Sequence, residues 1–373
     1  MIQAINLEGF FAGLDGIRGG RHLTHGLHPY PAKFISQIPR ALIEAYSSTG
    51  ETVLDPMCGS GTTLVEAIAS GRRAVGNDIN PISVMVTKAK TTQLSGGAIA
   101  ELLALAGHVE ADNLMAVEPP SFPNRQHWFT EPVSQALAAI RGAIMGVESA
   151  SARNLAECSL SAIIVGVSNQ DSETRWARVS RDVPYQEVLR RYSRHLREDI
   201  ERVCELSGVI DPVALTLQGD ARALALEDAS IDLVVTSPPY ANSHDYYLYN
   251  KLRMFWLGMD VRATQEAEFG SRNKHSDKKL EIDHYLDAMR AVLKECARVL
   301  RPGGRACIVV GDAVVRGEFY DMGSLLPEVA TDAPLAVETS FMFEQQKFTR
   351  AFTRGFGTKL AKSTHIVVFR RDP

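Results

Sequence analysis

Residues 53–63 read VLDPMCGSGTT, and this stretch decides the fold. Its apolar start predicts a short strand that stops at Asp55 before a glycine-rich turn. Residues 62–70 then predict a helix, and residues 73–78 predict a second strand with Asp78 at its tip. Strand, glycine turn, helix, strand and acid follow one another in Rossmann order, so we expect an α/β protein with a doubly wound parallel sheet.

The glycine turn has the chemistry of a nucleoside site. Gly59 and Gly61 let the backbone approach a ligand closely. Hydroxyls and helix N-terminal N–H groups for the ligand's polar atoms come from Ser60, Thr62 and Thr63. Because no Gly-Lys-Ser/Thr follows, the turn is not a Walker A loop, and ATP is disfavoured. The alternative is a tight strand-to-helix turn without a ligand.

Two acids extend this candidate site. Asp78 lies about twenty residues beyond the turn, where an acid at the end of the second strand accepts hydrogen bonds from ribose hydroxyls. Its alternative role is that of a turn or N-cap residue before Asn80. Asp220 follows Gly219 at another expected turn and is a candidate acceptor for an adenine amino group. A lone aspartate at such a turn is more often simply solvated.

The second half of the chain predicts further strands. Residues 232–236 are a β-branched apolar run that two prolines stop, and residues 306–310 read as another buried strand. Residues 284–300 predict an amphipathic helix between them, and residues 363–370 predict a last strand.

Residues 91–210 separate the two halves and show helical periodicity with few strand signals. We therefore expect a catalytic domain made of residues 1–95 and 211–373. Residues 96–210 would form a helical insertion, which is a candidate region for target recognition.

Residues 236–240, TSPPY, are the second informative motif. An exocyclic amino group on an aromatic base is a poor nucleophile because its lone pair is delocalised into the ring, so acceptors must hold its N–H bonds while the nitrogen attacks. The Ser237 hydroxyl and the Pro238 carbonyl, stiffened by Pro239, are suitable acceptors. Tyr240 can stack on a base swung out of the helix. The alternative is an ordinary strand-ending loop in which Tyr240 packs.

Composition bounds the remaining possibilities. The chain has 373 residues, 45% of them hydrophobic, and a formal net charge of -4, which fits a globular protein whose nucleic-acid contacts come from local patches. The five cysteines show no C-x-x-C or C-x-x-H spacing, so a reducing cytoplasm is the expected location. No signal peptide or membrane-spanning run is expected.

Together the two motifs resemble the amino-methyltransferases of DNA, the N4-cytosine and N6-adenine enzymes of restriction-modification type. The resemblance implies a class I methyltransferase sheet, S-adenosylmethionine as cofactor, duplex DNA as substrate and a cognate restriction endonuclease as partner. In this family D-P-x-x-G-S-G-T binds the cofactor, and [DNS]-P-P-[YFW] holds the target amine. The serine at Ser237 is most similar to the N4-cytosine branch.

The resemblance also assigns roles to residues. The segment HPYPAKF at 28–34 is similar to the family segment that lines the methionine end of the cofactor, although a proline-stiffened surface loop is the alternative. Met57 stands where many members have phenylalanine. The implied cofactor contacts are His28, Lys33, Phe34, Asp55, Met57, Gly59, Ser60, Gly61, Thr62, Asp78, Ile79, Asp220 and Ala221. The implied catalytic residues are Ser237, Pro238, Pro239 and Tyr240, with no covalent enzyme intermediate.

Basic residues suggest where DNA would bind. Residues 345–362 contain phenylalanines and no aspartate or glutamate. Their five cations are candidates for phosphate contacts, and they are Lys347, Arg350, Arg354, Lys359 and Lys362. A solvated basic hairpin is the alternative. A second arginine cluster at 175–197 is diluted by acids and is compatible with a plain exposed helix. Further cations at 272–279 follow the catalytic loop.

Other chemistries are less well supported. His22, His25 and His28 come without carboxylates at ligand spacing, so we expect no metal. C5 methylation needs a nucleophilic cysteine, usually in a Pro-Cys pair, and the chain has no such pair. The remaining alternatives are N6-adenine methylation of DNA, methylation of an RNA amino group, and a non-catalytic nucleic-acid-binding partner protein.

Overall fold

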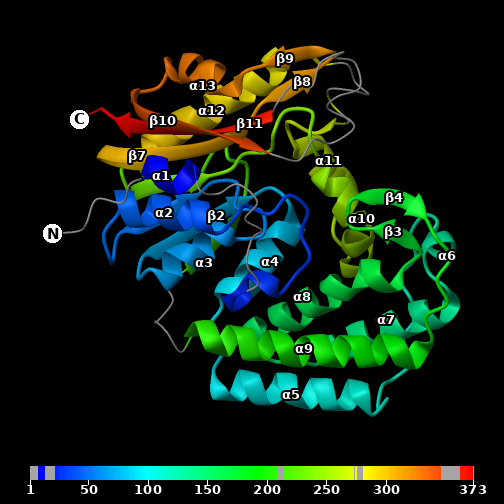
Figure 1. Ribbon diagram of the computed structural model, residues 1–373. Helices are drawn as coiled ribbons and strands as arrows, with labels where there is room; N and C mark the ends of the chain where they lie inside the picture. The colour runs from blue at the N-terminus through cyan, green and yellow to red at the C-terminus, as the bar shows by residue number, and fades with distance from the viewer. Residues whose placement is uncertain are drawn as a thin grey trace.

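The computed structural model describes residues 7–12, 22–207, 214–272, 274, 280–345 and 362–372. At its centre lies a seven-stranded sheet with the order β10-β11-β7-β6-β1-β2-β5 (Figure 1). The strands are β1 (Thr52–Asp55), β2 (Arg73–Asp78), β5 (Ala214–Gln218), β6 (Ile231–Thr236), β7 (Leu300–Gly311), β10 (Leu335–Gln345) and β11 (Lys362–Arg371).

The sheet confirms the expected α/β, doubly wound fold. β5, β2, β1, β6 and β7 run parallel, and β11 is inserted antiparallel between β7 and β10. From β1 the chain proceeds to β2 and β5 on one side, and then returns to β6 on the other side of β1. This reversal makes a switch point between β1 and β6, and ligands of such sheets bind outside the carboxyl ends of the strands at that point.

Alternate residues of the central strands point to opposite faces of the sheet and belong to two different hydrophobic cores. Val53 of β1 and Leu233 of β6 belong to the core that contains helices α2 (Gln37–Tyr46) and α3 (Thr62–Ala69). Their neighbours Leu54 and Val234 point to the other face, which packs against α12 (Ile282–Val299) and α13 (Met322–Ala330). Because both faces are covered by helices, these strands read as continuous apolar runs.

Seven further elements complete the described residues of this part of the chain. They are α1 (Leu7–Ala12), η1 (Leu23–Gly26), α4 (Pro81–Thr91), α10 (Tyr246–Leu257), α11 (Val261–Ala267), β8 (Ala313–Val315) and β9 (Glu318–Tyr320). β8 and β9 form an antiparallel pair apart from the main sheet.

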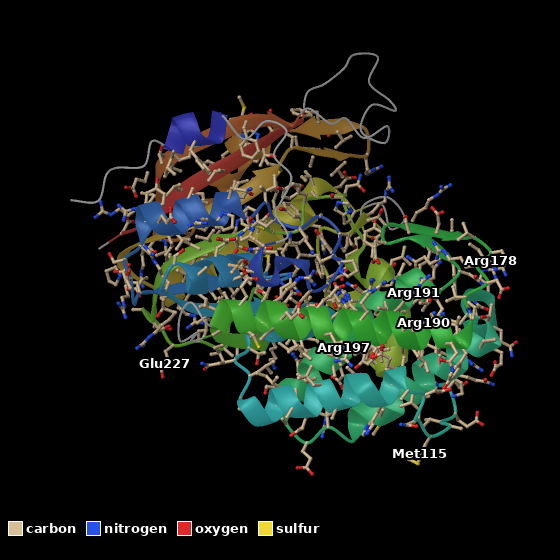
Figure 2. The ribbon with its side chains drawn as sticks, turned by 60° about the horizontal axis from the view of Figure 1, so that its bottom comes forward. Met115, Arg178, Arg190, Arg191, Arg197 and Glu227 are labelled. Carbon is tan, nitrogen blue, oxygen red and sulfur yellow. The ribbon has the colours of Figure 1, made fainter. Side chains whose placement is uncertain are left out.

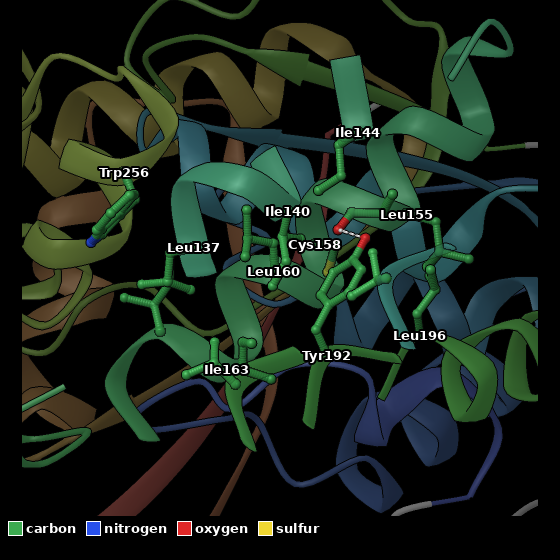
Figure 3. Packing of buried hydrophobic residues seen from close by; sticks show 14 of the residues in the cluster. Leu137, Ile140, Ile144, Leu155, Cys158, Leu160, Ile163, Tyr192, Leu196 and Trp256 are labelled. Carbon is green, nitrogen blue, oxygen red and sulfur yellow. Dashed lines mark hydrogen bonds between the residues drawn. The ribbon is translucent and has the colours of Figure 1, made fainter. Parts of the chain in front are cut away.

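A largely helical segment lies between α4 and β5. Its helices are α5 (Gly96–Glu110), α6 (Arg125–Trp128), α7 (Glu131–Met145), α8 (Ala150–Val167) and α9 (Tyr185–Ser207). They enclose a third apolar core, in which Tyr192 of α9 donates a 3.3 Å hydrogen bond to the carbonyl of Ala156 in α8 (Figure 3). Trp256 of α10 belongs to the same core, so the helical segment packs directly on the helix that follows the TSPPY motif.

One element of this segment was not expected. β3 (Gln170–Ser172) and β4 (Arg175–Arg178) form an antiparallel hairpin, so Arg175 and Arg178 lie on a strand and the expectation of a plain helix is wrong there. Residues 170–172 are polar, and the apolar alternation that marks a half-buried strand is missing from them. Within the part of the chain that the structure describes, none of the helices combines the length and the apolar composition of a membrane span.

Candidate active site

A cavity of about 680 Å³ opens at the carboxyl ends of β1, β2 and β6, at the switch point of the sheet. It brings together most of the residues that the two motifs single out. Those in its lining are Lys33, Phe34, Asp55, Met57, Gly59, Ser60, Thr62, Asp78, Ile79, Asp220, Ala221, Ser237, Pro238, Pro239 and Tyr240.

The glycine turn depends on backbone angles that other residues avoid. Gly59 has φ +49° and Gly61 has φ +75°. A Cβ on Gly61 would lie 2.8 Å from Oγ1 of Thr87, so this glycine permits close packing against α4 and does not line the cavity. The same Thr87 hydroxyl donates to the Gly59 carbonyl at 3.1 Å, and buried Lys90 donates to the Ser60 carbonyl at 2.8 Å.

Asp78 organises the turn from the tip of β2. Its Oδ2 accepts a 2.8 Å hydrogen bond from the Gly59 N–H, and its Oδ1 accepts one of 2.8 Å from the Asn80 N–H. Burial raises the pKa of Asp78 to about 6. The N-cap of α4 is Asn80, whose side chain accepts from the Ile82 N–H, so Asp78 is not the cap. Its carboxylate oxygens keep lone pairs for hydroxyl donors of a ligand.

Asp55 connects the cofactor side of the cavity to the TSPPY side. Its Oδ1 accepts hydrogen bonds from the Thr236 hydroxyl at 2.6 Å and from the Met57 N–H at 3.2 Å. Burial raises the pKa of Asp55 to about 6, against the effect of these donors. The carboxylate therefore fixes the ends of β1 and β6 relative to each other.

Aromatic rings form the wall around the TSPPY loop. Tyr240 packs against the core formed with α12, and Tyr246, at the start of α10, stacks on Tyr30 with ring centroids 6.0 Å apart. Burial raises the pKa of Tyr240, while a hydrogen bond with the Ser237 side chain acts in the opposite direction. The cavity thus offers flat apolar surfaces beside a hydroxyl and the Pro238 carbonyl, which suits a planar base with an amino group.

Tyr30 was missed by the sequence reasoning, although it lies within the HPYPAKF segment. Its ring lies against the turn, since a Cβ added to Gly59 would be 3.6 Å from it. Its hydroxyl forms a 2.7 Å hydrogen bond with the Ser83 side chain on α4. The similarity of the whole HPYPAKF segment to the family segment is the signal that could have identified Tyr30.

Glu268, just after α11, was also missed, and no motif marks it. The residue is 7% exposed and lines the cavity. Oε1 accepts a long 3.4 Å hydrogen bond from Asn80, and Oε2 is buried with no hydrogen-bond partner among the described residues. Burial, with the negative charge of Asp78 as the second cause, raises the pKa of Glu268 to about 8.

Two side chains of the HPYPAKF segment form hydrogen bonds within the protein, and one of them lies outside the cavity. His28 is completely buried outside the cavity lining, and its Nε2 forms a 2.9 Å hydrogen bond with the Ser161 hydroxyl on α8. Lys33 lines the cavity, but its ammonium donates to the carbonyls of His25 at 3.0 Å and His28 at 2.6 Å. Both side chains thus hold the segment in shape.

Asp220 lies in the cavity lining but is heavily engaged. Its two carboxylate oxygens accept hydrogen bonds from the Arg222 guanidinium at 2.6 to 3.1 Å, and Oδ1 also accepts from the Arg222 N–H at 2.9 Å. The Arg222 guanidinium in turn lies 5.7 Å from the ring centre of Phe269. A role at an adenine amino group would have to share the carboxylate with this ion pair.

The expected DNA-contacting segment lies largely beyond what the structure describes. Lys347, Arg350, Arg354 and Lys359 are outside the described residues, as is the side chain of Lys362 at the start of β11. In the insertion, Arg190 and Arg191 pair with Glu187, and Arg197 pairs with Glu110. These arginines lie along α9 on the face turned outward in Figure 2, as expected for a solvated helix face.

The histidines near the N-terminus have a partner that local spacing did not reveal. Glu66 of α3 is buried, and its Oε1 lies 2.7 Å from Nε2 of His25 and 3.3 Å from Nε2 of His22. Burial lowers the pKa of His25, although the hydrogen bond to Glu66 opposes this effect. The arrangement satisfies a buried carboxylate by hydrogen bonds.

Comparisons of the sequence with protein families and with known proteins point to one family. Residues 14–88 and 231–352, together more than half of the chain, match the family described as DNA methylase. The Type II methyltransferase M.MvaI of Kocuria varians is 29% identical over 272 residues, which are 65% of this chain and 59% of that protein. The Type II methyltransferase M.BsoBI of Geobacillus stearothermophilus is 23% identical over 309 residues, which are 71% of this chain and 59% of that protein.

The chain therefore spans less than two thirds of the length of either relative. Among solved structures, a SAM-dependent methyltransferase from Methanosarcina mazei is 11% identical, with 92% of this chain and 99% of that chain covered and a TM-score of 0.37.

Proposed function

The chain belongs to the DNA methylase family, and from this premise we propose that it transfers a methyl group from S-adenosylmethionine to the exocyclic N4 of cytosine in duplex DNA. The observation that carries the proposal is the shared cavity: the glycine turn and the Ser237–Tyr240 loop line one space, and the Asp55–Thr236 hydrogen bond joins them. Such a shared cavity would allow a methyl donor and a methyl acceptor to bind side by side.

The residues of the cavity fit S-adenosylmethionine. Asp55 and Glu268 are buried acids and Asp78 is a half-buried one, and Oε2 of Glu268 lacks a hydrogen-bond partner among the described residues. A cofactor with a positively charged sulfonium and ribose hydroxyls would supply both the missing charge and the missing donors. Asp78 and the glycine turn would hold the ribose. When bound, S-adenosylmethionine supplies a methyl group activated by the sulfonium.

The chain's own contribution to the reaction is positioning. Tyr240 would stack on the extruded base, while the Ser237 hydroxyl and the Pro238 carbonyl accept hydrogen bonds from its amino group. These acceptors would orient the nitrogen lone pair toward the methyl carbon of the bound cofactor. The proton that the amino group loses on methylation would pass to water through its hydrogen bond with the Ser237 hydroxyl, and S-adenosylhomocysteine would be the leaving group. Cys58 in the turn is buried, and burial raises the pKa of its thiol, which does not suit a covalent nucleophile.

Cytosine is proposed because a serine, Ser237, occupies the first position of the S-P-P-Y motif within the TSPPY loop. We assign residues 1–95 and 211–373 to the catalytic domain and 96–210 to an insertion that recognises the target. The relatives matched are Type II methyltransferases, so a cognate restriction endonuclease is the proposed biological partner.

The experiment that tests methyl transfer uses methyl-labelled S-adenosylmethionine with duplex DNA of mixed sequence and with RNA of the same sequence. We expect label on DNA and none on RNA. Label on RNA alone would overturn the substrate assignment. Binding of the cofactor without label on any nucleic acid would instead favour a non-catalytic binding protein.

A further inference from the structure

The β3–β4 hairpin brings the helical insertion to the mouth of the cavity. Its two strands are joined by Glu173 and Thr174, and Thr174 is part of the cavity lining. Thr174 is exposed, so it lies at the rim of the cavity. Figure 1 shows the hairpin beside α10.

Contacts with α10 fix the tip of the hairpin in this place. Arg253 of α10 is fully buried, and its guanidinium forms a 2.6 Å ion pair with Glu173 and a 3.0 Å hydrogen bond to the Ser161 carbonyl of α8. On the same helix, the Lys251 ammonium lies 5.6 Å from the ring centre of Trp176 in β4. Since α10 starts shortly after Tyr240, the hairpin is anchored to the helix that leads away from the catalytic loop.

The charge of the tip is available to a partner. Arg175 follows Thr174 directly, and its side chain is 74% exposed. Its ion pair with Asp171, at 3.3 Å, is a surface contact of the kind that contributes little stability and is easily exchanged for a phosphate. Arg272 is also exposed and lines the same cavity, so positive charge is present both at the hairpin tip and on the segment that follows Glu268.

We propose that the β3–β4 hairpin is the element of the insertion that enters the DNA beside the target base, with Thr174 and Arg175 contacting the strand from which the base is extruded. The inference rests on the proposed function and names the recognition surface of the same site. A two-stranded ribbon fits the major groove of B-DNA, and an arginine at its tip can contact phosphates or base edges. The ion pair between Glu173 and the buried Arg253 keeps the tip in register with the catalytic loop.

The test compares Arg175→Glu with Arg190→Glu. Arg190 is an exposed arginine on α9, paired with Glu187, and it does not line the cavity, so this variant controls for the change in net charge. Measurements are the KM for duplex DNA, its dependence on salt, and the affinity for S-adenosylmethionine. Arg175→Lys, which keeps the charge, serves as a milder second variant.

We expect Arg175→Glu to raise the KM for duplex DNA by roughly tenfold or more. The slope of log KM against log salt concentration should fall by about one, as the loss of one phosphate contact would cause. The affinity for S-adenosylmethionine should stay unchanged. Arg190→Glu should leave all three quantities near those of the unmodified protein. An Arg175→Glu variant with unchanged KM and salt dependence would overturn the role of the hairpin while leaving the methyltransferase assignment intact. If the unmodified protein labels no DNA, both proposals are overturned.

Discussion

The Thr236 hydroxyl donates a 2.6 Å hydrogen bond to Oδ1 of Asp55, and this bond joins the last residues of two adjacent parallel strands. Asp55 begins the glycine turn, and Thr236 precedes Ser237 of the catalytic loop. The bond therefore fixes the site proposed for the methyl donor relative to the site proposed for the acceptor. Catalysis by positioning depends on such fixed relations, since small displacements of reacting groups cost large factors in rate.

Replacing Thr236 with valine tests this relation. Thr236→Val keeps the side-chain shape but removes a donor from a buried carboxylate, so we expect the free energy of unfolding to fall by about 1–3 kcal/mol. Methyl transfer should fall as well. Thr236→Ser, which keeps the hydroxyl, is the matched control. Chemical denaturation of both variants measures the difference, and equal stability of the valine and serine variants would contradict the role given to the bond.

Replacing Tyr240 with alanine tests the proposed stacking on the target base. Tyr240→Ala removes the ring, so we expect methyl transfer to fall strongly while affinity for S-adenosylmethionine stays nearly unchanged, because the glycine turn and Asp78 are intact. Tyr240→Phe keeps the ring and should retain much of the activity. Cofactor titration and single-turnover rates separate the two effects. A parallel loss of cofactor affinity and rate in the alanine variant would argue against stacking.

Replacing Asp78 with alanine should have the opposite pattern. Asp78 accepts hydrogen bonds from Gly59 and Asn80 and is the proposed acceptor for the ribose hydroxyls. We expect cofactor affinity to fall first, by about 1–3 kcal/mol of binding free energy. Asp287→Ala, at an exposed position on α12 outside the cavity lining, is a suitable comparison for the removal of one carboxylate. Unchanged affinity of the Asp78 variant would rule out its role at the ribose.

Cofactor affinity should rise with pH. Burial raises the pKa of Glu268 to about 8 and those of Asp55 and Asp78 to about 6, so the free cavity holds protons near neutral pH. A cationic cofactor favours the ionised carboxylates and lowers their pKa values on binding, which releases protons. The association constant should therefore increase from about pH 5 to about pH 8 and then level off.

Glu268→Gln provides the control for this pH dependence. The variant lacks the carboxyl group with the highest pKa of the three. Its affinity for S-adenosylmethionine should therefore level off near pH 6 to 7, where Asp55 and Asp78 finish titrating. Calorimetry in buffers of different ionisation enthalpy measures proton release directly. S-adenosylhomocysteine, which has no sulfonium charge, should show a weaker pH dependence. An identical pH profile for the unmodified protein and Glu268→Gln would contradict the contribution of Glu268.

The sequence predicted those parts of the fold where local signals agree. β2 was predicted with its observed bounds, because Gly71 ends the preceding helix and the strand that follows stops at Asp78. The helix at 284–300 was predicted within two residues of α12, since its periodic apolar residues stop before a Pro-Gly-Gly turn. The resemblance implied that the glycine turn and the TSPPY loop serve one reaction, and both line the same cavity.

The features that were missed arise from tertiary contacts. Glu268 belongs to no local motif and reaches the cavity only because the chain after α11 folds back over Asn80. Lys90 looks like an exposed helix residue in sequence, but in the structure it is buried beneath the carbonyl of Ser60. His28 lies outside the cavity lining and forms a hydrogen bond with Ser161, which is far along the chain in α8. None of these partners can be recognised from spacing.

The most direct test of the central claim identifies the methylated base. The purified protein is incubated with methyl-labelled S-adenosylmethionine and duplex DNA of mixed sequence, the DNA is digested to nucleosides, and the labelled nucleoside is identified by mass spectrometry. We predict label on N4-methylcytosine. Label on N6-methyladenine would keep the positioning mechanism but contradict the assignment of cytosine, and the absence of label from DNA would contradict the proposed function itself.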